Sequence, residues 1–258
     1  MTARIRSDLD AIPAYVPGRN FPGAIKLASN ETTQGPLPSV RDKIAEAVTT
    51  VNRYPDIMAT ALVDELAAVL KVERENVTVG NGSVALCQEI VQITCNPGDE
   101  VVFAWRSFEA YPIITHVAGA RPVQVPLDTN HTHDLDAMLG AITERTRVVF
   151  VCNPNNPSGT VVARSALEKF LDAVPASVLV VLDEAVVRRV VDALERQRRP
   201  EVVALRGVVV DHVEDDLDAG QVHGLDHRLE LLDLQAAGGR VVELARAGAV
   251  LGVRGEEA

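Results

Sequence analysis

The stretch RVVFVCNPNNPSG, residues 147–159, sets a continuous apolar run directly before a loop that contains two Asn-Pro steps. A short apolar run bounded by turn residues is typical of a strand that is buried on both faces. Proline fixes its own φ and restricts the residue before it, so we expect the loop after this strand to be rigid. Such a loop can hold an asparagine amide against a ligand, although it is also ordinary turn chemistry.

Apolar strands and amphipathic helices alternate on both sides of this loop, along roughly the first 185 residues. Strands are expected at residues 77–79, 100–104, 122–125, 147–152 and 178–182. Helices are expected at residues 39–52, 60–71, 84–94, 107–118, 134–142 and 165–173. Apolar strands separated by helices predict an α/β fold with a mainly parallel sheet flanked by helices. In such a sheet, ligands bind at the carboxyl ends of the strands.

Two further polar features follow predicted strands and should lie at the same edge as the Asn-Pro loop. Gly80-Asn81-Gly82-Ser83 opens a helix, whose free N–H groups and partial positive charge suit an anion. Alone this turn is weak evidence, because Gly-rich turns are common and the GK[ST] ending of a Walker loop is absent. Asp183 ends an apolar strand, where a carboxylate requires a partner. The partner of this carboxylate would be a cationic ring nitrogen, the N-terminus of a helix or the cation of a salt bridge.

Composition limits the classes of partner. The chain has 258 residues, and its formal net charge of -11 disfavours nucleic acid and an acidic membrane surface. Cys87, Cys95 and Cys152 lie far apart with no CxxC pair, which indicates reduced thiols rather than disulfides or metal ligands. No apolar stretch has the length of a signal peptide core or a membrane helix. We therefore expect a cytoplasmic protein.

Six stretches, in a fixed order and spacing, carry a resemblance to a known family. They are LASNET (27–32), NRYPD (52–56), VGNGS (79–83), GDEVVFAWRSFEAYP (98–112), CNPNNPSGT (152–160) and VVLDEA (180–185). Through about residue 185 the chain resembles the fold-type I aminotransferases that use pyridoxal 5'-phosphate (PLP), in particular the histidinol-phosphate and aromatic amino acid (phenylalanine) branch. The resemblance implies a homodimer that moves an amino group between an aromatic amino acid, or histidinol phosphate, and the 2-oxo acid 2-oxoglutarate.

The same resemblance implies roles for single residues in a PLP site. Backbone N–H groups of Ser83 and Val84 would hold the cofactor phosphate, and Phe108 would stack on the pyridine ring. Asn156 would donate to the phenolic oxygen. Asp183 would pair with the pyridinium nitrogen and keep the ring protonated. From the residues alone, Phe108 is equally explained as core filling.

Two more residues are implied outside this group. Tyr54, in NRYPD, resembles the tyrosine that reaches the cofactor phosphate of the partner subunit, and Asn30 would line the substrate side. Without the resemblance, Tyr54 is an ordinary loop tyrosine before a proline.

The resemblance breaks after residue 185. The family motif continues DEAY, whereas position 186 is Val186. The lysine that would bind PLP as a Schiff base and shuttle the proton is expected about thirty residues after Asp183, in a stretch that here reads VEDDLD, residues 213–218. The chain contains only Lys26, Lys43, Lys71 and Lys169, none of them in a matching motif. No catalytic residue is therefore identifiable.

The last segment, residues 186–258, has an unusual composition. It contains no Lys, Phe, Trp, Tyr, Met, Cys, Asn, Ser, Thr or Ile. It is either an out-of-frame reading of GC-rich DNA or a biased but genuine tail. We expect this segment to be helical or disordered. It follows an N-terminal arm (1–35) and a PLP-binding large domain (36–185) that is expected to be incomplete. The small C-terminal domain of the family is expected to be missing.

One feature of this segment resembles a metal site. His223 and His227 stand at the i, i+4 spacing of zinc ligands on a helix. The surrounding residues lack an HExxH pattern and Gly224 weakens a helix, so we predict no metal site.

The sequence leaves two main hypotheses for the chain, and a third option, a PLP lyase or acyltransferase of the same fold, is disfavoured because the NPNNPSG and RYPD motifs suit aminotransferases. Either it belongs to an aminotransferase whose activity is impaired because the lysine is absent, or it is a truncated relic that binds PLP weakly or dimerises without catalysis. An absorbance titration with PLP separates the two.

Overall fold

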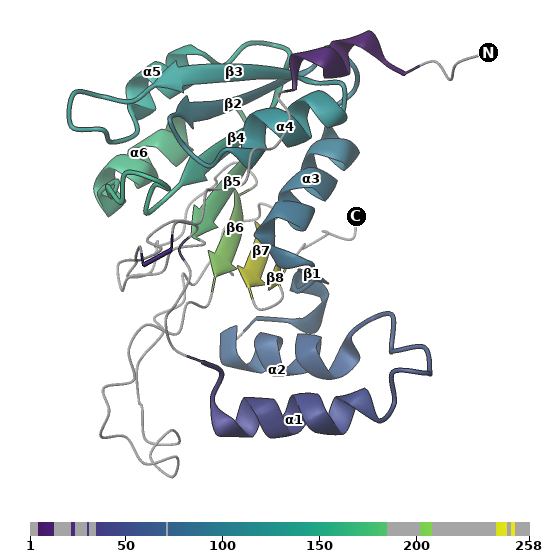
Figure 1. Ribbon diagram of the computed structural model, residues 1–258. Coiled ribbons are helices and arrows are strands. Elements are labelled where there is room, and N and C mark those ends of the chain that lie inside the picture. Colours follow the sequence, from purple (N-terminus) through teal and green to yellow (C-terminus); the bar gives the residue numbers. More distant parts are fainter. Residues whose placement is uncertain are drawn as a thin grey trace, which may run out of the picture.

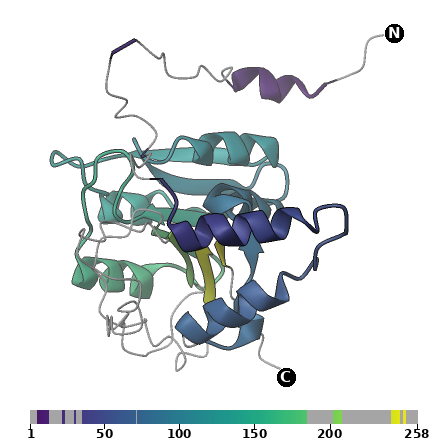
Figure 2. The same ribbon diagram turned by 60° about the horizontal axis from the view of Figure 1, so that its bottom comes forward.

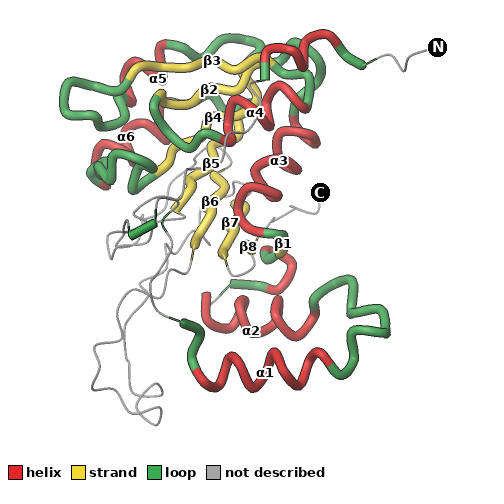
Figure 3. Tube along the Cα trace, viewed as in Figure 1, coloured by secondary structure: helices red, strands yellow, loops and turns green. Residues whose placement is uncertain are grey.

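The computed structural model describes residues 5–12, 22–23, 30, 35–70, 72–184, 202–207, 241–246 and 249–250. Helices and strands alternate through most of the described chain (Figures 1 and 3). The helical elements are η1 (Ser7–Ala11), α1 (Pro38–Val48), α2 (Thr60–Leu70), η2 (Arg74–Asn76), α3 (Gly82–Thr94), α4 (Ala110–Val117), α5 (Leu135–Gly140) and α6 (Arg164–Ala173). The strands are β1 (Val79–Gly80), β2 (Glu100–Trp105), β3 (Arg121–Pro126), β4 (Thr146–Cys152), β5 (Leu179–Glu184), β6 (Val202–Gly207), β7 (Val241–Arg246) and β8 (Ala249–Val250).

The main sheet has six strands in the order β3-β2-β4-β5-β6-β7. Every neighbouring pair in it is parallel. The predicted α/β fold with a parallel sheet is therefore confirmed. β1 does not join this sheet, because it pairs antiparallel with β8, Val79 opposite Val250.

Helices cover both faces of the sheet, which explains why its strands are continuously apolar. Successive side chains of a strand point to opposite faces. In β4, Val148 and Phe150 pack in the cluster with α3 and α4. Val149 and Val151 pack in the cluster with α5 and α6. All four side chains are fully buried, so a strand with polar alternate positions would not fit here.

The described parts of residues 186–258 are strands, where helix or disorder was expected. β6 pairs with β5 and β7 pairs with β6, both parallel, and they extend the sheet by two strands. Their sequences, VVALRG and VVELAR, begin with paired valines, whose β-branched side chains favour strands. The histidines considered for a metal site lie outside the described residues.

The N-terminal arm is tied to the sheet through α4. The Arg6 guanidinium donates to the backbone carbonyls of His116 and Val117, at 2.9 and 3.0 Å. These carbonyls end α4, where unpaired C=O groups favour a cation. Arg6 also pairs with Asp8.

α1 differs from the other α-helices of the described chain because none of its residues is buried. It lies with α2 beyond the end of the sheet at which β1 stands (Figures 1 and 2). Its exposed apolar side chains include Val40, Ile44 and Val48. A helix with an uncovered apolar face normally packs against another surface.

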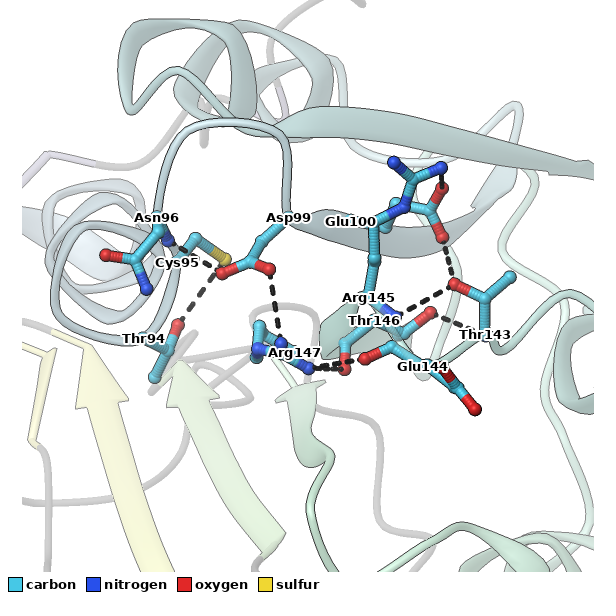
Figure 4. A network of polar contacts seen from close by, with 10 residues as sticks. All are labelled: Thr94, Cys95, Asn96, Asp99, Glu100, Thr143, Glu144, Arg145, Thr146 and Arg147. Atoms are coloured by element: carbon cyan, nitrogen blue, oxygen red, sulfur yellow. Dashed lines mark hydrogen bonds and ion pairs between the residues drawn. The ribbon is translucent and has the colours of Figure 1, made fainter.

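A polar network lies at the amino ends of β2 and β4 (Figure 4). Glu100 is 4% exposed and accepts a hydrogen bond of 2.6 Å from the Thr143 hydroxyl. Arg121 and Arg145 stand 3.7 and 4.0 Å from its carboxylate. This network is at the edge of the sheet opposite to the carboxyl ends, so its role is structural.

Replacing Glu100 with alanine is expected to lower the free energy of unfolding by roughly 2 kcal/mol, because the hydrogen bond from the Thr143 hydroxyl to the buried Glu100 carboxylate is lost. Glu100→Gln keeps an acceptor and should cost about half as much. Urea unfolding followed by circular dichroism measures both. Equal midpoints for the wild type and Glu100→Ala would contradict this prediction.

Candidate active site

Asp183 stands at the carboxyl end of β5 and is 1% exposed. The Tyr111 hydroxyl donates a hydrogen bond of 2.6 Å to its carboxylate. Tyr111 is fully buried and stacks on Phe150, with ring centroids 4.5 Å apart. Burial, and next the charge of Asp183, raise the pKa of Tyr111 well above its ordinary value. Tyr111 therefore stays protonated and remains a donor to Asp183.

Cys152 lies beside this pair on β4, directly opposite Asp183 in register. Burial, followed by the charge of Asp183, raises the pKa of the Cys152 thiol to about 12. The protonated thiol donates to the carbonyl of Pro154 at 3.5 Å. Its sulfur also accepts from the backbone N–H of Asn156, at 3.4 Å. Cys152 thus holds the Asn-Pro loop next to the strand end.

The raised pKa values of Cys152 and Tyr111 predict a loss of stability in alkali. Both groups keep their protons in the folded state but ionise more easily when unfolded. Stability is therefore complete below the ordinary thiol pKa of 9.0 and falls as the pH rises above it. Urea midpoints at about pH 7 and about pH 10 test this, and Cys152→Ala should lose less over that interval. A flat profile would refute the prediction.

The Asn-Pro loop after β4 carries three asparagines with different environments. Asn153 and Asn155 are 4% and 2% exposed. Asn153 closes the loop on Val162, accepting from its N–H at 2.9 Å and donating to its carbonyl at 3.3 Å. Asn156 is half-buried, and within the described chain its side-chain amide makes no hydrogen bond, in contrast to its backbone N–H. The Asn156 amide is thus available to a ligand.

Phe108 lies between β2 and α4 and touches the Tyr111 ring edge to face, at 5.5 Å between centroids and 89° between planes. It is half-buried, so part of the ring is open. Phe108, Tyr111 and Asp183 therefore form one continuous set of contacts. Phe108 also packs against the core cluster of α3 and α4, so its predicted role against a ligand stays a prediction.

Ser83 and Val84 form the first turn of α3, the helix that follows β1. Gly82, before them, has a φ of +77°, which favours glycine. A Cβ at Gly80 would come within 3.0 Å of the Leu86 side chain, which would have to shift. Ser83 is 2% exposed and Val84 is half-buried. In Figure 1 the start of α3 lies at the end of the sheet to which β5, β6 and β7 point.

Tyr54 and Asn30 are not brought to this edge by any contact within the described chain. Tyr54 lies in the loop between α1 and α2 and is fully exposed. Asn30 is exposed with a φ of +50°. Their predicted roles stay predictions.

The family model described as Aminotransferase class I and II matches residues 22–211. The chain belongs to this family. Among curated relatives, it is 65% identical over 210 residues to the aromatic amino acid aminotransferase of Rhodococcus jostii, and these cover 80% of the chain and 59% of the relative. The corresponding protein of Nocardia farcinica is 60% identical over 215 residues, covering 80% of the chain and 60% of the relative. The chain thus spans about three fifths of the length of these relatives.

Solved aminotransferase structures share the fold. The histidinol-phosphate aminotransferase of Sinorhizobium meliloti, solved in complex with pyridoxal-5'-phosphate, is 30% identical with a TM-score of 0.58. The alignment covers 61% of this chain and 43% of that one. N-succinyldiaminopimelate aminotransferase from Mycobacterium tuberculosis has a TM-score of 0.64 at 19% identity, covering 88% and 57%, a likeness of fold alone.

The match of this chain to its family runs past residue 185, where the quoted motifs end, and includes β6. β6 lies in register with β5, so that Arg206 stands opposite Glu184. The chain therefore leaves β6 at the same edge as Asp183. The sequence after Gly207 contains no lysine, and neither does any position after Lys169.

No helix of the described residues is both long and apolar enough to cross a membrane.

Proposed function

We propose that this chain is an aromatic amino acid aminotransferase by descent, which binds PLP at the Asp183 edge without a covalent bond and has lost most of its transaminase activity. The observation that carries the proposal is the buried Asp183 at the end of β5, in a sequence without any lysine after Lys169. The names of the most similar relatives support an aromatic amino acid and a 2-oxo acid as substrates, ahead of histidinol phosphate.

The residues present fit the non-covalent contacts of PLP. Asp183 offers a buried carboxylate, which suits a cationic ring nitrogen and opposes its loss of a proton. The open part of Phe108 suits an aromatic ring, and the free Asn156 amide suits an anionic oxygen. N–H groups of Ser83 and Val84 in the first turn of α3 suit a phosphate. The covalent contact does not fit, because no lysine follows β6.

Each residue of the site has a separate task in this proposal. PLP, when bound, supplies an electron sink for charge that develops on the substrate. Asp183 would hold the proton on the ring nitrogen, and Tyr111 would keep that carboxylate ionised and oriented. Neither Tyr111 nor Cys152 replaces the lysine as a base, because their raised pKa values keep both protonated near neutral pH. A site of this kind binds the cofactor and lacks the group that moves the α-proton.

A titration of the purified chain with PLP tests the proposal. Trp105 is the only tryptophan and adjoins the Phe108 loop, so quenching of its fluorescence reports binding. We expect saturable quenching that dialysis reverses, and no protein-bound pyridoxyl group after borohydride reduction. We also expect no measurable turnover of phenylalanine with 2-oxoglutarate. Normal turnover, or pyridoxylation of one specific lysine, would overturn the proposal.

We further propose that the chain forms a homodimer through α1. The apolar side chains on this helix, and Ile57 and Met58 in the loop after it, are exposed in the single chain. Tyr54 lies in the same loop, where a partner subunit could meet it. Sedimentation velocity of the wild type and of Ile44→Asp measures this, and a monomeric wild type contradicts it. A dimer without PLP binding would favour the dimerising relic.

A further inference from the structure

A buried group of hydrogen bonds centred on Asn155 joins three loops at the carboxyl edge of the sheet. The Asn155 amide nitrogen donates to the carbonyl of Arg106 at 3.1 Å and to the hydroxyl of Ser158 at 2.7 Å. Its amide oxygen accepts from the Ser107 hydroxyl at 2.8 Å and lies 3.0 Å from Nε2 of His133. All four hydrogen-bonding positions of this side chain are thus filled.

The partners determine which atoms carry the protons. A carbonyl only accepts, so the atom of Asn155 that faces Arg106 is the nitrogen, and its oxygen faces His133. His133 must therefore donate through Nε2. The imidazole is 5% exposed, and burial lowers its pKa, which favours the neutral form. His133 is then the Nε2–H tautomer, with Nδ1 as an acceptor that has no partner within the described chain.

A second series of hydroxyls closes the same group. The Thr160 hydroxyl donates to the carbonyl of His131 at 2.7 Å. The Ser158 hydroxyl, 2.8 Å away, must therefore donate to Thr160, and it accepts from Asn155. The loop at residues 153–160 is thus bound twice to the loop at residues 131–133. It is bound by two more hydrogen bonds, both of the Asn155 side chain, to residues 106–107.

These loops carry residues of the proposed cofactor site. Phe108 directly follows Ser107, and Asn156 directly follows Asn155. Within the described chain, no hydrogen bond of the Phe108 or Asn156 side chain joins it to the other loop. The hydrogen bonds of the Asn155 side chain to Arg106 and Ser107 therefore tie the segment that carries Phe108 to the segment that carries Asn156.

We propose that Asn155 and His133 are positioning residues for the cofactor site, the Asn155 amide locking the Phe108 loop to the Asn156 loop and His133 holding that amide in place. The choice of PLP as the ligand of this site rests on the proposed function. The locking itself is a property of the chain without PLP, so it can be tested separately.

The test compares the wild type with His133→Leu, which removes the donor but keeps an apolar volume, and His133→Gln, which keeps an N–H. His116→Leu, the same change on α4 away from this group, is the matched control. PLP affinity is measured through Trp105 fluorescence and the circular dichroism induced in the bound cofactor. Hydrogen exchange of residues 105–110 and 153–160 is measured without PLP.

We expect His133→Leu to weaken PLP binding about tenfold and to reduce the induced circular dichroism, with faster exchange in both segments. His133→Gln should stay within about threefold of the wild type, which a loss of packing alone would not explain. His133→Leu with unchanged exchange at residues 105–110 overturns the inference. If the wild type does not bind PLP, the proposed function is refuted. The hydrogen-exchange data then still show whether Asn155 and His133 hold the two loops together. If His133→Leu does not fold, Ser107→Ala decides by the same criteria.

Discussion

Asp183→Asn is expected to weaken the binding of PLP by about 30-fold, since a hydrogen bond between two charged groups becomes one to a neutral amide. The asparagine has the same shape and still accepts from Tyr111, so the fold should be retained. Fluorescence titration of Trp105 measures the affinity, and thermal unfolding checks the fold.

The control for this variant is Asp136→Asn, whose carboxylate is 89% exposed on α5. It changes the net charge by the same amount and should bind PLP like the wild type. If both variants lose affinity equally, the effect comes from total charge and Asp183 is not the partner of the ring.

Tyr111→Ala is expected to lower the free energy of unfolding by about 4 kcal/mol, the range for deleting a large buried aromatic side chain. The loss combines a cavity beside Phe150 with a missing donor to Asp183. Tyr111→Phe keeps the ring and loses only the hydroxyl, so it should cost about 2 kcal/mol.

Chemical denaturation of the three proteins separates packing from hydrogen bonding. Tyr111→Phe should also weaken PLP binding, because the Asp183 carboxylate loses the donor that orients it. A Tyr111→Phe variant as stable as the wild type would show that the hydroxyl contributes nothing.

The sequence predicted the parallel sheet well, because its strands are buried on both faces and so read as continuous apolar runs. The valines and Phe150 of β4 form such a run, which fits a buried strand and no other kind of element. It predicted less for β1, which consists of Val79 and Gly80 only, because its partner strand β8 follows 169 to 171 residues later in the chain. A contact so distant in the chain leaves no local pattern.

The site was predicted in part. The family motifs contain Phe108, Asn156 and Asp183, and the structure links the surroundings of these residues through Tyr111 and Cys152. Tyr111 was not named, although its position three residues after Phe108 was a usable signal. Asn155 and His133 were also missed. Their hydrogen bonds join loops from three parts of the chain, and loop geometry of that kind does not follow from residue spacing.

The pairing of β6 with β5 bears on any shortened form of this protein. β5 is apolar for most of its length and is bonded along one side to β4 and along the other to β6. A chain cut at residue 185 would present a row of unpaired N–H and C=O groups beside exposed valines. Such an edge recruits strands from other molecules, so the shortened protein should precipitate during expression, whereas the full chain keeps this side capped.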